Sequence, residues 1–255
     1  MTSRVVGAAI TWVGHATTLI ELDGVRLLTD PVLRNRIGPL VRIAPRVRAD
    51  ELGQVDCVLL SHLHFDHTDL RSLRDIGSSV PVLAPYPAAG WLARKGLQAV
   101  RELRPGEEVT VGDLRMTATP ADHDRRRLPH GPAAEPIGYL VRGSSCIYFA
   151  GDTDFFPAMA ELSGLVDVAL LPVWGWGARL GPGHLDPDSA AAVAALIAPA
   201  IAIPIHWGTF TLGRPAKRPV DPERPARQFA ALTKTRAPAV EVRVLAPGQR
   251  TELAV

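Results

Sequence analysis

The sequence is poor in cysteine and in aromatic residues: two cysteines and 5% Phe, Trp and Tyr stand among 255 residues. Cys57 and Cys146 lie in apolar stretches typical of buried strands, so we expect unpaired core thiols in a reducing compartment, with a bridge as the alternative. No apolar run approaches the roughly 20 residues of a membrane-spanning helix, and no N-terminal segment resembles a secretory signal. These absences predict a cytoplasmic protein without a membrane span, and they leave peripheral lipid contact open.

A strong excess of one charge is also missing, because 28 Lys and Arg against 26 Asp and Glu give a net charge of +2. A near-neutral chain gives no general argument for a nucleic-acid partner, and we expect none. With 47% hydrophobic and 21% charged residues the composition is that of an ordinary globular protein. No linker-like segment divides the chain, so we expect one domain over residues 1–255. Oligomeric state leaves no signal in the sequence.

Short strands alternating with a few helices are the dominant pattern. Asp23-Gly24 between two apolar stretches is a strong hairpin signal. Asp186 followed by Pro187 and an alanine-rich run predicts the start of a helix that continues to Ile197. Two Pro- and Arg-rich stretches, residues 34–48 and 213–225, are expected to be long loops. The other expected helices cover residues 68–76, 87–95 and 222–233, and the expected strands cover 9–22, 25–30, 55–61, 80–85, 98–103, 107–111, 114–121, 137–143, 145–152, 166–173, 200–207 and 240–247.

The densest group of polar side chains lies in LLSHLHFDHTDL, residues 59–70, directly after an apolar run. Imidazoles and carboxylates are ligands of borderline divalent metals, and a bound cation removes the cost of burying several of them. His62 and His64 are two residues apart and point to one side of an extended chain, while Asp66 and His67 continue around the turn. One stretch could thus supply two neighbouring metals. The weaker alternative is a polar loop that caps the next helix, with Asp66 or Thr68 as N-cap.

Further candidate ligands stand where other apolar strands end. His123 follows LRMTATPAD, Asp152 follows SCIYFAG and His206 follows AIAIPI. Strand ends are the places from which a rigid scaffold delivers side chains to a shared site. Together with the first stretch they make five histidines and two aspartates that are candidates for one metal site.

These motifs resemble the ordered ligand motifs of the metallo-β-lactamase superfamily: HLHFDH, the lone His123, GDT at 151–153 and IPIHWGTF at 203–210. The resemblance covers about residues 10–210. It implies an α/β (α+β) fold, a four-layer αββα sandwich in which helices flank two mixed sheets, with two divalent metals at the sheet edge. It further implies that one metal is held by His62, His64 and His123 and the other by Asp66, His67 and His206, with Asp152 bridging them.

A narrower resemblance rests on TWVGHATTLIELDGVRLLTDPVL, HLDPDSA and IPIHWGTF. These segments are similar to the branch that holds N-acyl-phosphatidylethanolamine phospholipase D, the closer match, and ascorbate-6-phosphate lactonase. The branch implies a metal-bridging hydroxide that attacks a phosphodiester or a phosphorylated small molecule. A lactone or ester hydrolase with the same metals is the first alternative. An iron-dependent oxidoreductase or a non-catalytic metal-binding member is the second.

The same resemblance makes Asp66, Asp152 and His184 the expected catalytic residues. His184, in GPGHLDP, would be a proton donor or a substrate contact, and a loop histidine bonded to backbone or to a ligand carboxylate is the alternative. His15, in GHAT, is expected to support the site and not to bind metal. Zinc is the metal that the family favours, with manganese or iron as alternatives.

Substrate signals are thinner and come from two arginine groups. Arginines that reach the mouth of a metal site would favour a small anionic substrate, since guanidinium matches phosphate and carboxylate. The alternative is a solvated loop in an arginine-rich protein. Trp174 and Trp176 would either wall the pocket or anchor the packing. The arginines in question are Arg34, Arg36, Arg42, Arg46 and Arg48 in one stretch and Arg125, Arg126 and Arg127 after His123.

Overall fold

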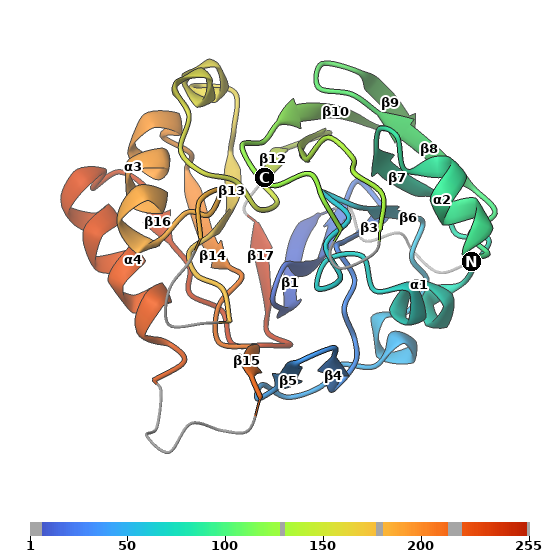
Figure 1. Ribbon diagram of the computed structural model, residues 1–255. Coiled ribbons are helices and arrows are strands. Elements are labelled where there is room, and N and C mark those ends of the chain that lie inside the picture. The colour runs from blue at the N-terminus through green and yellow to red at the C-terminus, as the bar shows by residue number, and fades with distance from the viewer. Residues whose placement is uncertain (1–6, 128–130, 177–180, 214–220, 254–255) are drawn as a thin grey trace.

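The computed structural model describes residues 7–127, 131–176, 181–213 and 221–253, and two large mixed sheets dominate it (Figure 1). The first sheet has the order β17-β1-β2-β3-β6-β7-β8, with antiparallel pairing up to β3 and parallel pairing from β3 to β8. Its strands are β1 (Ala8–Gly14), β2 (Thr17–Leu22), β3 (Val25–Thr29), β6 (Cys57–Leu59), β7 (Val82–Pro85), β8 (Val100–Leu103) and β17 (Arg250–Leu253).

The second sheet has the order β16-β14-β13-β12-β11-β10-β9. It is antiparallel from β9 to β12 and parallel from β12 to β16. Its strands are β9 (Glu108–Val111), β10 (Leu114–Pro120), β11 (Ile137–Arg142), β12 (Cys146–Phe149), β13 (Val168–Pro172), β14 (Ile201–Ile205) and β16 (Glu241–Val242). A small third sheet joins β15 (Phe210–Leu212), β5 (Leu40–Arg42) and β4 (Arg36–Ile37).

Helices cover the outer faces of the two sheets (Figure 1). The inner faces meet in one core, to which the first sheet contributes Trp12 and Ile20 and the second Tyr139 and Phe149. Leu73 of α1 and Leu92 of α2 pack on the other side of the first sheet. These layers confirm the predicted αββα sandwich. The helices are α1 (Leu70–Ile76), α2 (Ala89–Arg94), α3 (Pro187–Ile197) and α4 (Arg224–Arg236), with short 3-10 helices η1 (Ala49–Leu52) and η2 (Pro157–Leu162). None of the helices in the described ranges is long and apolar enough to cross a membrane.

Local signals account for several elements. Asp23 and Gly24 both have positive φ, 49° and 76°, which suits the tight turn of the predicted hairpin between β2 and β3. Asp186 caps α3 by accepting hydrogen bonds from the backbone N–H groups of Asp188 and Ser189, at 3.0 and 2.9 Å, and Pro187 is the first helical residue. Both predictions are confirmed.

The structure corrects four local expectations. The stretch 9–22 is not one strand, because His15, with φ of 55°, turns the chain between β1 and β2. Helix α1 is capped by Asp69, so neither Asp66 nor Thr68 serves as the N-cap. The strand expected at 240–247 ends at Val242, since the chain then crosses to the first sheet. The loop expected at 34–48 holds β4 and β5, and residues 214–220 of the other expected loop lie outside the described residues.

Five strands end at one edge of the sandwich, and their ends carry the predicted site. The chain reaches Asp30 after β3, His62 after β6, His123 after β10, Asp152 after β12 and His206 after β14. The turn after β12 depends on Gly151, whose φ is 63° and whose missing Cβ would lie 2.5 Å from the Cβ of Ser61. Close approach of two strand ends therefore requires a glycine at this position.

We predict that Gly151→Ala lowers the free energy of unfolding by about 2–4 kcal/mol, since it adds a steric clash to the cost of a positive φ. Gly164→Ala is the matched control, because Gly164 has a φ of 72° but no atom within 4 Å of an added Cβ. The control is expected to lose only about 1 kcal/mol. Urea unfolding of both variants measures the difference, and equal losses would contradict the steric argument.

Candidate metal centre

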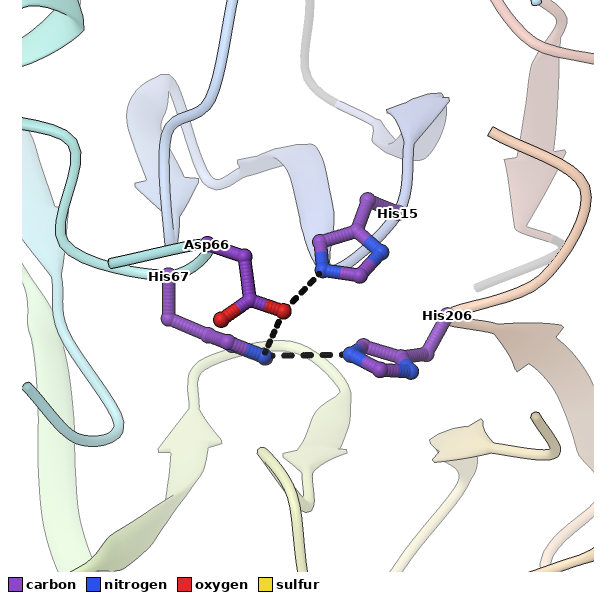
Figure 2. A group of neighbouring side chains, drawn as sticks. All are labelled: His15, Asp66, His67 and His206. Atoms are coloured by element: carbon purple, nitrogen blue, oxygen red, sulfur yellow. Dashed lines mark hydrogen bonds and ion pairs between the residues drawn. The ribbon is translucent and has the colours of Figure 1, made fainter. Parts of the chain in front are cut away.

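The structure brings all seven predicted residues together at this edge. Four groups of side chains each offer ligand atoms within 4.8 Å of one another: His62, His64 and His123 form one, and His67, Asp66 and His206 form another together with His15. The third joins His123 to Asp152 and His184, and the fourth joins Asp30 to His62 and His67. Figure 2 shows the second group, in which the Asp66 carboxylate faces His15 and His67, and His67 in turn faces His206. The cluster is able to bind metal.

Asp30 and Ser61 orient two of the imidazoles from behind. The Asp30 carboxylate accepts hydrogen bonds from the Ser61 backbone N–H at 2.7 Å, from the Ser61 hydroxyl at 2.5 Å and from His67 Nδ1 at 2.7 Å. Because the Ser61 proton is given to Asp30, the Ser61 oxygen accepts from His62 Nδ1 at 2.9 Å. Both rings therefore carry their proton on Nδ1 and turn Nε2 towards the centre.

Backbone carbonyls orient two more rings in the same way. His123 donates from Nδ1 to the Gly183 carbonyl at 2.7 Å, and His206 donates from Nδ1 to the Trp174 carbonyl. Nε2 of His123 then lies 3.0 Å from Nδ1 of His64, and Nε2 of His206 lies 3.1 Å from Nε2 of His67. Histidines that bind metals are oriented by such outward hydrogen bonds.

This arrangement fits a cation and little else. Ring nitrogens that face each other at 3.0–3.1 Å repel unless a proton or a metal lies between them. Nε2 of His62 and Oδ1 of Asp152 are buried and have no hydrogen-bond partner among the described residues. A buried polar atom without a partner is costly, and a metal ion would satisfy both atoms.

Burial sets the protonation that metal binding needs. It lowers the pKa of His123 to about 4 and of His206 to about 3, so both rings are neutral at pH 7. Burial alone would raise the pKa of Asp152, but His206 and His67 hold it well below its usual range. His67 is the exception among the rings. Burial opposes its charge, yet Asp152 and Asp30 raise its pKa well above the ordinary value, so this position calls for a positive charge.

Asp66 is held by two donors that are not themselves candidate ligands in the expected set. His15 Nε2 lies 3.1 Å from Asp66 Oδ2, and the Trp176 indole N–H donates to the same oxygen at 2.8 Å. The His15 ring packs on the His206 ring with centroids 3.9 Å apart, and Phe210 meets it edge-on at 5.3 Å. His15 therefore contacts two candidate ligands at once, which agrees with a supporting position.

His184 lies at the exposed side of the cluster. Its Nδ1 is 3.2 Å from the carbonyls of Gly181 and Pro182, so Nδ1 carries a proton and Nε2 faces the centre. Nε2 is 3.7 Å from Asp152 Oδ2, and the ring meets His123 edge-on with centroids 4.6 Å apart. Its side chain is 26% exposed, against 4% for Asp152. His184 is thus the member of the cluster best placed to meet a ligand from solvent.

The arginines mostly bond the fold itself, so they match neither the expected substrate contacts nor the alternative of a merely solvated loop. Arg34 binds the Asp69 carboxylate through two nitrogens at 2.9 and 2.7 Å. Arg127 donates to the carbonyls of Leu63 and Thr68 at 2.6 and 3.0 Å, and so clamps the loop that carries the first histidines. The remaining contacts are Arg36 to the Gly38 carbonyl, Arg42 to the carbonyls of Val32 and Arg34, Arg46 to the Leu33 carbonyl, Arg48 to Asp50 and Arg125 to Glu135.

Asp30 and Ser61 were missing from the sequence-based set, and Trp176 was expected only as a pocket wall or a packing anchor. Asp30 carried the same signal as Asp152, a carboxylate directly after an apolar strand, and could have been found by it. Ser61 and the indole N–H of Trp176 act only as hydrogen-bond partners of ligand candidates. Nothing in their spacing shows which residue they contact.

Comparison with known proteins agrees with this geometry. The profile of the family described as "Beta-lactamase superfamily domain" matches residues 25–207. A metal-dependent hydrolase of Methanopyrus kandleri is 34% identical over 251 residues, which cover 95% of this chain and 99% of the relative. N-acyl-phosphatidylethanolamine-hydrolyzing phospholipase D 1 of Caenorhabditis elegans is 32% identical over 81% of this chain, which spans 65% of that relative. A metallo hydrolase from Ignicoccus hospitalis shares the fold with a TM-score of 0.74 and 23% identity, covering 97% of this chain and 99% of that one.

The fold and the cluster thus define a metallo-β-lactamase-type protein, and the chain belongs to the beta-lactamase superfamily. Within it the chain is a metal-dependent hydrolase, like the relatives that match it over nearly their whole length.

We predict that Arg127→Lys lowers the free energy of unfolding by about 1–3 kcal/mol, because the shorter lysine side chain sets its ammonium back from the position of Nη1, which bonds both carbonyls, and removes the guanidinium that lies over the Trp91 ring. Arg126→Lys is the control, since Arg126 is the exposed neighbour. Its expected change is within about 0.5 kcal/mol. Thermal unfolding of both variants makes the comparison, and an undisturbed Arg127→Lys protein would show that the clamp adds nothing.

Proposed function

We propose that the chain is a dinuclear hydrolase that takes two divalent cations, zinc first and manganese or iron as alternatives. His62, His64 and His123 would hold one cation, and Asp66, His67 and His206 the other, with Asp152 shared between them. The inward convergence of ring nitrogens, which face each other at 3.0–3.1 Å, carries this proposal. Two divalent cations, when bound, lower the pKa of water towards neutrality and polarise a scissile carbonyl or phosphoryl bond.

The chain's own residues would perform three tasks around those cations. Asp152, kept ionised by its histidine neighbours, would hold the two halves of the cluster at a common spacing. His15 and Trp176 would fix the Asp66 carboxylate in one orientation, as supporting hydrogen bonds do at metal sites. His184, whose Nδ1 keeps its proton against two carbonyls, would take up a proton on Nε2 and pass it to the oxygen of the leaving group, because it is the half-buried imidazole at the open side.

A phosphodiester or a phosphorylated small molecule is the substrate class that we favour. The support is the 32% identity with the phospholipase over 81% of this chain. Divalent cations at paired sites suit an in-line displacement at phosphorus, since they stabilise both the attacking and the leaving oxygen. The guanidinium groups give this anionic substrate class less support than we expected from the sequence, because most of them have hydrogen-bond partners in the fold.

A lactone or ester is the second candidate, and the same observation about the arginines favours it. Four arginines near the site donate hydrogen bonds to Asp69 or to backbone carbonyls and not to the centre: Arg34, Arg42, Arg46 and Arg127. A neutral carbonyl substrate needs no guanidinium, only polarisation of its C=O bond. The two candidates use the same metal centre and differ in what the mouth must recognise.

Asp152→Ala and His184→Ala separate metal binding from proton transfer. We predict that Asp152→Ala retains at most one metal per chain and loses nearly all turnover, because the shared ligand is gone. His184→Ala is expected to keep both metals and to lose about 10²- to 10⁴-fold in kcat, the usual contribution of a general acid. Elemental analysis of the purified proteins for Zn, Mn and Fe, together with steady-state rates, measures both effects.

Asp113→Ala is the control for these variants, since Asp113 is exposed in the turn between β9 and β10. It should match the unmodified protein in metal content and rate. An Asp152→Ala protein with two metals and a normal rate would end the bridging assignment. A His184→Ala protein with full metal and an unchanged rate would remove His184 from the mechanism.

A direct comparison of two substrates tests the choice between the candidate functions. We predict that the metal-replete protein hydrolyses bis(p-nitrophenyl) phosphate with a higher kcat/KM than dihydrocoumarin, a simple lactone. Asp152→Ala serves as the blank for both reactions. A clear preference for the lactone would overturn the phosphodiester assignment and establish carbonyl chemistry at the same centre.

A further inference from the structure

His184 is carried by a short segment that is tied to the chain after β12. Gly183, the residue before it, donates its backbone N–H to Asp154 Oδ2 at 3.3 Å. Leu185, the residue after it, donates its backbone N–H to the Thr153 carbonyl at 2.8 Å. The chain on both sides of His184 is thus anchored to the same two consecutive residues.

These two residues also hold the loop that carries His123. The Thr153 hydroxyl accepts a hydrogen bond from the Asp122 N–H at 2.9 Å, and the Asp154 N–H donates to the Asp122 carbonyl at 2.8 Å. Thr153 is fully buried, and its hydroxyl donates to the Asp154 carbonyl at 2.8 Å. Thr153 and Asp154 therefore form a bridge between the loop of a candidate metal ligand and the segment of His184.

The two sides of this bridge meet at Gly183, where a side chain would be crowded. Gly183 has a φ of 81°, and an added Cβ would lie 3.0 Å from His123 Nδ1 and 3.1 Å from His123 Cα. The Gly183 carbonyl accepts from His123 Nδ1 at 2.7 Å, while its N–H faces Asp154. One residue is therefore held from both sides, and His184 directly follows it.

Both oxygens of the Asp154 carboxylate take part in this arrangement. Oδ1 accepts from the Phe155 N–H at 2.8 Å, which fixes the side chain against its own backbone and leaves Oδ2 for Gly183. The Asp154 side chain is half-buried. A hydrogen bond from a backbone N–H to a carboxylate is stronger than one between neutral groups, and partial burial strengthens it further.

The His184 ring depends on this hold for its distance from the centre. Among the described residues its hydrogen-bond partners are the carbonyls of Gly181 and Pro182, which belong to its own loop. A group that transfers a proton must lie within hydrogen-bond reach of the reacting atom, and a small misplacement lowers the rate strongly. The contacts of the backbone therefore decide where Nε2 lies.

We infer that Asp154 is a positioning residue, which holds the segment of His184 so that the imidazole meets a bound substrate in one place. The inference rests on the proposed proton transfer by His184. Asp154 acts through Gly183 and has no contact with the reacting atoms. Its loss is therefore expected to lower kcat and to change KM and metal content little.

A double-mutant cycle of Asp154→Ala and His184→Ala tests this assignment. The substrate is bis(p-nitrophenyl) phosphate or dihydrocoumarin, whichever the unmodified protein hydrolyses faster. We expect Asp154→Ala to keep the metal content of the unmodified protein and a KM within about twofold, and to lose about tenfold in kcat, the ratio that one net hydrogen bond supplies. In the His184→Ala protein the same substitution should cost no further rate. An equal loss in both backgrounds would overturn the assignment.

Hydrogen exchange measured by NMR gives a readout that depends on no reaction. We expect the Gly183 N–H to exchange about tenfold faster in Asp154→Ala, while the Leu185 N–H should change less, because its acceptor is a backbone carbonyl that the substitution leaves in place. Unchanged exchange at Gly183 would overturn the hold. A His184→Ala protein with an unchanged rate would contradict the proposed proton transfer, and exchange at Gly183 would still decide whether Asp154 holds the segment.

Asp124→Ala is the matched control. Asp124 also accepts a backbone N–H, that of Arg126 at 3.0 Å, and within the described ranges it bonds no residue of the His184 loop. It should keep both the rate and the exchange at Gly183. If Asp154→Ala does not fold, Asp154→Asn replaces it, because a carboxamide has one acceptor oxygen and cannot serve both N–H groups. A smaller loss in the same direction is then expected, and unchanged kcat and exchange would overturn the assignment.

Discussion

Each buried imidazole at the sheet edge has two nitrogens, and one of them can bind a metal only if the other carries the proton and donates it in an outward hydrogen bond. Asp30, Ser61 and the carbonyls of Gly183 and Trp174 provide those outward contacts. They come from four separate stretches of chain, so the loops that carry them must be placed as accurately as the ligands. The hydrogen bonds at this edge therefore determine which nitrogen of each ring carries the proton.

The loops at the edge have little regular structure, and arginine side chains supply hydrogen bonds that strands or helices would otherwise give. Arg127 bonds two carbonyls of the loop after β6, and Arg42 and Arg46 bond carbonyls in the stretch after β3. Backbone carbonyls near a buried site need partners, and guanidinium groups reach them from the surface. This explains why so many arginines lie close to the ligand motifs without facing the centre.

The sequence placed the strands, and the polar residues at their ends that meet in the structure, because those depend on local signals, whereas the four-layer arrangement was implied by the resemblance to the superfamily. Apolar runs mark buried strands, and a polar residue directly after such a run marks a strand end. The Asp-Gly turn and the Asp186 cap are also local signals, because each is predicted from a few neighbouring residues. Contacts between distant segments left no such signal. The Asp66 carboxylate meets His15 and Trp176 only because the sandwich folds, and the end of the last predicted strand was decided by a crossing to the other sheet. The expected substrate contacts of the arginines failed for a similar reason, since a position near the ligands in sequence does not show where a side chain points.

The order in which the centre is assembled follows from its distribution along the chain. His67 and His206 face each other at 3.1 Å, yet 139 residues separate them in sequence. During synthesis from the N-terminus the strands β1 to β8 of the first sheet and the HLHFDH loop therefore emerge long before β14, which leads to His206. A nascent chain that has reached only β12 presents charged and polar ligand side chains without the strand that completes their surroundings. Closure of this long loop is a late and slow event in the life of each molecule, and the C-terminal half decides when it happens.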